Sequence, residues 1–156
     1  MTASPTFPLI RAQLEAVRRK VPNATAVGLR CPGRWAGEPT RSDGGQRYLI
    51  RQCDSPLAAR LALREPAGEG TIRVLVTRLE DRDLGEDVLV RLAKRSLIPV
   101  DPWRIVPTLF QARQVDPRLA AHPWIADLLF ESLPPGGYPP VPGGFLDAET
   151  VWPLLL

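Results

Sequence analysis

The sequence has 156 residues, a length that suits one domain with a single core. Hydrophobic residues make up 44% and charged residues 24%, close to the averages of globular proteins, so the composition argues against a generally disordered chain. A net charge of +3 is too small to indicate a nucleic-acid partner by itself.

Residue counts and motifs disfavour several kinds of site. Two cysteines and one histidine, Cys31, Cys53 and His122, are too few for a zinc site. No Gly-x-Ser-x-Gly elbow and no glycine-rich loop followed by Lys-Ser/Thr is present. No apolar run approaches 18 residues, and no secretory signal is recognisable. We therefore expect buried, reduced cysteines, no cofactor and a cytoplasmic location.

The N-terminal third predicts a helix followed by two strands. Apolar residues recur at helical spacing from Leu9 to Val17, and the helix should end near Pro22 after Arg18, Arg19 and Lys20. Residues 24–30 read as a strand with small residues on one face, and residues 47–53 alternate as a second strand that we expect to pair with it. Residues 31–46 are rich in turn formers and predict a loop or hairpin tip anchored by Trp35.

The middle third predicts a helix followed by the central strand of the sheet. Ser55 is a typical N-cap residue, and Pro56 suits the first position of a helix. This helix should end near residue 64. Residues 72–76 then form an apolar, β-branched run that suits a strand covered on both faces, so we expect it at the centre of the sheet.

A single helix is predicted after this strand. Asp83 and Glu86 have capping-box spacing, and apolar residues recur at helical spacing from Leu84 to Leu92. Asp87 and Arg91 have the i,i+4 order that favours an ion pair, and residues 94–95 add cations to the last turn.

After residue 100 the pattern changes to helices. The pairs Asp101–Pro102 and Asp116–Pro117 repeat the cap-plus-proline signal, and residues 134–144 form a connector with five prolines and four glycines. The predicted fold is therefore α/β: a small sheet of about three strands flanked by helices in residues 1–100, followed by a helical subdomain in residues 101–156 that packs with it.

Candidate functional groups are few. The acidic turn over residues 80–87 could hold a divalent cation, but capping and solvation explain the same carboxylates, and both interpretations stay open. A proline-rich segment at 138–142 could bind an aromatic groove or serve as a rigid connector. The candidate interface residues are the following: Arg91, Lys94, Arg95, Arg18, Arg19 and Trp35.

Three segments carry a resemblance to a known family. They are LGEDVLVRLAKRSLIPVDPWRIVPTLFQARQVDPRLA at 84–120, WIADLLFESLPPGGYPP at 124–140 and GGFLDAETVW at 143–152. Together they resemble the N-terminal region of PglZ proteins of type 2 bacteriophage-exclusion (BREX, phage growth limitation) systems, with similarity from about Val27 to the C-terminus.

This resemblance implies an antiviral role in bacteria. It implies an intact protein with a metal-dependent alkaline-phosphatase-superfamily domain further along, whose metal-binding residues have no counterparts here. We therefore expect this segment to be non-catalytic and to dock other defence proteins or position the phosphatase domain. The alternative is a DNA-binding module of the same defence system, with a helix-turn-helix-like arrangement in the helical half from Asp101, although residues 101–133 carry three arginines against four acidic residues.

Overall fold

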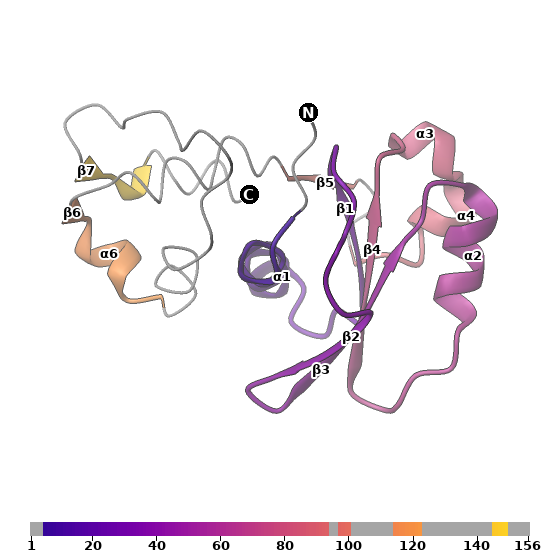
Figure 1. Cartoon of the computed structure of the whole chain (residues 1–156), viewed down its shortest axis with the longest axis horizontal. Coiled ribbons are helices and arrows are strands. Elements are labelled where there is room, and N and C mark those ends of the chain that lie inside the picture. The colour runs from indigo at the N-terminus through magenta and orange to yellow at the C-terminus, as the bar shows by residue number, and fades with distance from the viewer. Residues whose placement is uncertain (1–4, 94–96, 101–113, 123–144, 150–156) are drawn as a thin grey trace.

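The computed structural model describes residues 5–93, 97–100, 114–122 and 145–149. Its main feature is a five-stranded sheet with the order β2-β3-β4-β1-β5, so β4 lies at the centre (Figure 1). The strands are β1 (Ala26–Arg30), β2 (Thr40–Asp43), β3 (Gln46–Gln52), β4 (Thr71–Thr77) and β5 (Ile98–Pro99). The predicted α/β class and the central position of the strand that begins at Thr71 are confirmed.

The number of strands, about three, was wrong. The strand β2 was missed because Thr40, Arg41 and Ser42 are exposed and polar, so no apolar alternation marks them. It forms a hairpin with β3 through Gly44 and Gly45, whose φ angles of 56° and 84° suit the two-residue turns that glycine favours. The other missed strand, β5, has two residues.

The pairing of β3 also differs from the prediction. We expected β3 to pair with β1, but it lies between β2 and β4. It is antiparallel to β2 and parallel to β4, with Tyr48 opposite Ile72. On its other side β4 runs parallel to β1, with Val27 opposite Val74. Parallel central strands buried on both faces account for the apolar run in β4.

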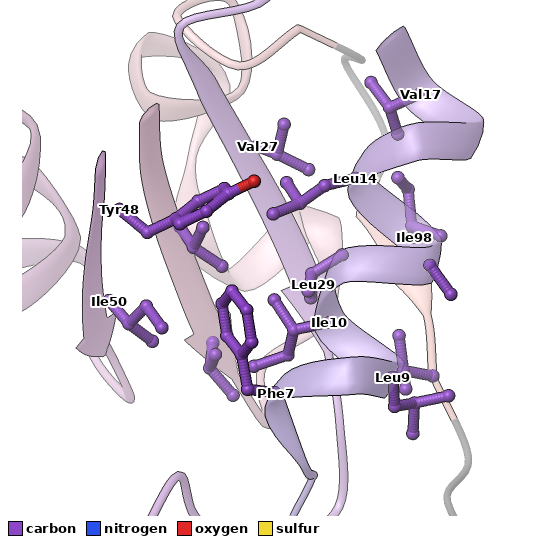
Figure 2. Packing of buried hydrophobic residues seen from close by; sticks show 14 of the residues in the cluster. Phe7, Leu9, Ile10, Leu14, Val17, Val27, Leu29, Tyr48, Ile50 and Ile98 are labelled. Atoms are coloured by element: carbon purple, nitrogen blue, oxygen red, sulfur yellow. The ribbon is translucent and has the colours of Figure 1, made fainter. Parts of the chain in front are cut away.

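Helix α1 (Phe7–Lys20) covers one face of the sheet. Phe7, Ile10 and Leu14 point from the helix toward β1 and β3 (Figure 2). The rings of Phe7 and Tyr48 meet edge to face with centroids 5.2 Å apart. The predicted helix is confirmed, and its last turn carries the three expected cations.

The opposite face of the sheet is covered by α2 (Pro56–Arg64), α3 (Asp81–Leu84) and α4 (Glu86–Leu89) (Figure 1). The predicted N-cap is confirmed, because the Ser55 hydroxyl accepts a hydrogen bond from the Ala58 N–H at 3.1 Å. The single helix predicted after β4 is wrong: Gly85, with a φ of 95°, separates two four-residue helices. No capping box forms, since neither helix has a side-chain cap bond.

Three short elements follow the sheet in the described residues. They are β6 (Gln114–Val115), α6 (Pro117–Ala120) and β7 (Phe145–Leu146), and β6 pairs parallel with β7. The predicted cap at Asp116 is confirmed by a 2.9 Å bond from the Arg118 N–H. Leu119 and Ala148 belong to the same core cluster as Leu9 of α1.

Most of the predicted helical subdomain, including the 134–144 connector and the 138–142 segment, lies outside the described residues. Among the residues that are described, no helix combines the length and apolar character that crossing a membrane requires.

Candidate functional site

The most distinctive surface is the outer side of α2 and α4. Leu57, Leu61 and Val90 expose 63%, 60% and 57% of their surface, although they belong to or adjoin helices whose inner sides are buried. Leu57 and Leu61 are four residues apart, so they share one side of α2. Isolated exposed leucines are ordinary, but several large apolar residues on one helical layer are typical of interaction sites.

An ion pair joins the two helices on this surface. The Arg60 guanidinium donates to both carboxylate oxygens of Asp87, at 2.7 Å from Nε and 3.4 Å from Nη2. The hydrogen bond from Arg60 lowers the pKa of Asp87, and the same bond raises the pKa of Arg60. We call the surface formed by Leu57, Leu61, Val90 and this ion pair the α2/α4 face.

The predicted Asp87–Arg91 pair is therefore replaced by Asp87–Arg60. Because α4 ends at Leu89, Arg91 lies beyond the helix, and its Nη2 donates to the carbonyl oxygen of Leu63 at 3.3 Å. Arg91 is exposed directly beside Val90, so this interface candidate lies at the edge of the α2/α4 face.

The other interface candidates are placed elsewhere. Arg18 and Arg19 are exposed in the last turn of α1, on the opposite side of the sheet from α2. Trp35 is partly buried against the core, and its Nε1 donates to the Glu38 carbonyl oxygen at 3.0 Å. Lys94 and Arg95 lie outside the described residues. The described candidates thus do not form one cluster.

The acidic turn does not gather its carboxylates at one point. Asp81 accepts the Leu97 N–H at 2.9 Å, Glu80 pairs with Arg82 at 3.2 Å, and Asp87 pairs with Arg60. Within the described ranges, the acids that do converge are Asp116, Asp147 and Glu149.

This carboxylate cluster surrounds Arg118. The Nη2 atom of Arg118 lies 2.7 Å from Asp116 Oδ2 and 2.6 Å from Glu149 Oε2, and Nη1 bonds Glu149 as well. The Arg118 side chain lowers the pKa of Asp116 to about 2 and that of Glu149 to about 2. A hydrogen bond with Glu149 raises the pKa of Asp147. A guanidinium already satisfies these oxygens, so the cluster joins α6 to residues 147–149.

Removing this cation should change the acid titration. We expect Arg118→Gln to raise the pKa of Asp116 and Glu149 toward ordinary values. Both folded-state pKa values are depressed, so the stability they contribute is present above pH about 4.5 and is lost as the pH falls toward 2. Carboxyl ¹³C NMR titration measures both groups, with Asp87 as an internal control. Unchanged pKa values would show that Arg118 is not their cause.

The carboxyl ends of the central strands hold both thiols. Cys31 and Cys53 are buried, as expected, and neither forms a disulfide bond in the described structure. Burial, followed by the nearby Asp54 charge, raises the pKa of Cys53 to about 11, so this thiol is protonated near neutral pH. It therefore suits packing rather than nucleophilic attack.

Asp54 connects two loops at this edge. It accepts the Arg78 N–H at 3.0 Å and the Gln52 amide at 3.1 Å, and Gln52 in turn accepts the Trp35 N–H. Burial raises the pKa of Asp54, but the hydrogen bonds from Arg78 and Gln52 outweigh it and lower the pKa overall. A cavity of about 340 Å³ lies beside this network, next to Arg30.

Comparison with known proteins identifies the family. A sequence model of the family described as the BREX system PglZ N-terminal domain matches residues 6–101. These residues span α1 through β5 and make up more than half of the chain. No curated protein and no solved structure matches significantly. The match begins earlier than Val27, and it ends before most of the C-terminal segments that suggested the resemblance. The chain therefore belongs to the family of BREX system PglZ N-terminal domains.

Proposed function

We propose that this chain is a non-catalytic, cytoplasmic module that docks other proteins of a phage-defence system through the α2/α4 face. Two observations support the proposal: membership of a BREX protein family, and the exposure of Leu57, Leu61 and Val90. The second observation carries the docking role, because a partner would remove this apolar surface from water.

The composition of the face suits a protein partner. Fully burying a leucine or valine side chain is worth about 1.5–3 kcal/mol, and a few central apolar residues often dominate binding. Arg60, Asp87 and Arg91 add polar groups beside the apolar residues, in the mixture that protein interfaces show. Positioning of a downstream alkaline-phosphatase-superfamily domain, implied by the resemblance, would be the intramolecular form of the same docking.

Binding to purified BREX components, each tested singly against the immobilised 156-residue chain, tests this function. We expect one component to bind, and the double variant Leu57→Ser/Leu61→Ser to weaken that binding at least tenfold. Val21→Ser is the matched control, because Val21 is 36% exposed at the end of α1, on the other side of the sheet.

Nuclease treatment and a salt series separate docking from DNA binding. Capture that survives nuclease and changes little between low and high salt supports docking, whereas capture lost with nuclease supports a DNA-binding module. Equal binding by the double variant and the parent chain would overturn the assignment of the α2/α4 face. Failure of every component to bind would overturn docking of partner proteins.

A further inference from the structure

A second surface feature shares no residue with the α2/α4 face. A cavity of about 780 Å³ opens where β2 and β3 meet the loop between α2 and β4. Its volume falls in the range of about 300–1,000 Å³ typical of small-molecule sites. The residues that carry the inference are Ser42, Arg47, Leu49, Pro66, Gly68 and Thr71.

Three polar residues line up across the strands at this cavity. Ser42 of β2 lies opposite Arg47 of β3, and Arg47 lies opposite Thr71 of β4. Neighbouring strands are about 4.8 Å apart, so opposed residues bring their side chains to one face together. The sheet thus presents one guanidinium between two hydroxyl groups.

The Arg47 side chain packs over the loop. A Cβ atom added at Gly68 would lie 3.1 Å from Arg47 Nη1 and 3.8 Å from Thr71 Oγ1, so both polar atoms approach the same point. The absence of a side chain at Gly68 leaves room for the guanidinium.

The polar atoms here lack partners within the described part of the chain. Arg47 forms no ion pair there, whereas Arg51, four residues along the same strand, pairs with Glu65 at 2.7 Å. The Thr71 hydroxyl oxygen is buried and has no hydrogen-bond partner among the described residues. Buried polar groups in native proteins usually have partners, so the unsatisfied Thr71 hydroxyl leaves a hydrogen bond to be made beside the exposed Arg47 guanidinium, at a point that a ligand could occupy.

We propose that this cavity binds a small phosphate monoester. The Arg47 guanidinium and the Ser42 hydroxyl would donate to the phosphate oxygens, as such groups commonly do, and rotation of the Thr71 side chain would bring its buried hydroxyl to them. Leu49 and Pro66 provide an apolar wall for the organic part of the ligand. Glu38 also borders the cavity, so an extended polyanion fits less well than a compact monoester.

NMR titration of the ¹⁵N-labelled 156-residue chain tests the proposal. Inorganic phosphate, adenosine 5′-monophosphate and adenosine are added separately at constant ionic strength. We expect the two phosphate-bearing probes to shift the amide signals of Ser42, Arg47, Gly68 and Thr71, and adenosine to leave them unchanged. Equal shifts with adenosine, or no shifts with either phosphate probe, would overturn the proposal.

Matched variants identify the donors. We expect Arg47→Gln to weaken nucleotide binding at least tenfold and Thr71→Val to weaken it several-fold, since valine keeps the shape of threonine without the hydroxyl. Arg82→Gln is the control, because Arg82 is highly exposed in α3 at the other end of the sheet. A loss in Arg82→Gln equal to that in Arg47→Gln would show a general charge effect and overturn the site.

An oligonucleotide without terminal phosphates separates a monoester from nucleic acid. Tighter binding of this oligonucleotide than of the nucleotide at the same amides would overturn the small-ligand assignment. The site is also independent of docking: Leu57→Ser/Leu61→Ser should leave nucleotide binding unchanged, and Arg47→Gln should leave partner binding unchanged. Failure of one proposal therefore does not decide the other.

Discussion

Truncating Leu75 to alanine is expected to lower the free energy of unfolding by about 2–5 kcal/mol. Leu75 is 1% exposed in the central strand and belongs to the core cluster shared with α2 and α4. The neighbouring strands are paired on both sides of β4, which limits how far the structure can relax into the cavity. Urea unfolding followed by circular dichroism should show a lower midpoint with an unchanged slope.

Leu61→Ala is the matched control for this experiment. It deletes the same atoms at a position that is 60% exposed, so we expect a change within about 0.5 kcal/mol. The same variant should weaken docking, because Leu61 belongs to the α2/α4 face. A loss of stability in Leu61→Ala as large as that in Leu75→Ala would mean that the chain itself buries Leu61, and would contradict the proposed interface.

The sequence predicted the strands whose burial leaves a local pattern. The apolar run in β4 and the three consecutive buried residues of β3, Tyr48 to Ile50, come from packing on both sheet faces, so each strand could be recognised alone. The edge strands could not be recognised in this way. Residues 40–43 are polar because they lie at an exposed edge. The strand β5 consists of only Ile98 and Pro99, which is too short for a periodic pattern.

The helix predictions were confirmed where the signal lay in neighbouring residues. They were wrong where contacts between distant parts of the chain determine the structure. Ser55 caps α2 through its own side chain, as its sequence position indicates. The Asp87–Arg91 pair was inferred from helical spacing, but Gly85 interrupts the helix and Arg60 comes from another element. An ion pair between α2 and α4 depends on how the two helices pack, and spacing within one helix gives no information about that.

The candidate sites were the hardest feature to predict from the sequence, because they too depend on how distant elements pack together. Leu57 and Leu61 fit a helical apolar stripe, and only the packing of α2 shows that Ala59 and Leu63 face the core instead. The alignment of Ser42, Arg47 and Thr71 requires the register of three strands, one of which was not predicted. Arg91, by contrast, was a sequence candidate that does lie beside the α2/α4 face.

Gly28 offers a direct test of the packing between β1 and the residues that follow α4. A Cβ atom at this position would lie 2.5 Å from Leu97 Cδ2 and 2.7 Å from Leu92 Cδ1, far closer than carbon atoms approach in proteins. The small-residue face predicted for this strand is thus the space that these leucines occupy. We expect Gly28→Ala to cost about 1–3 kcal/mol of unfolding free energy through overpacking.

A double-mutant cycle with Leu97→Ala should identify the cause of this cost. Leu97 is 5% exposed, so its truncation alone is destabilising, but it also removes the closer of the two clashing groups. Gly28→Ala should therefore cost less in the Leu97→Ala background, with a coupling of at least about 0.5 kcal/mol. The clash with Leu92 remains, so the rescue is partial. Additive losses in urea unfolding would instead attribute the effect of Gly28→Ala to the backbone of β1 rather than to the approach of Leu97.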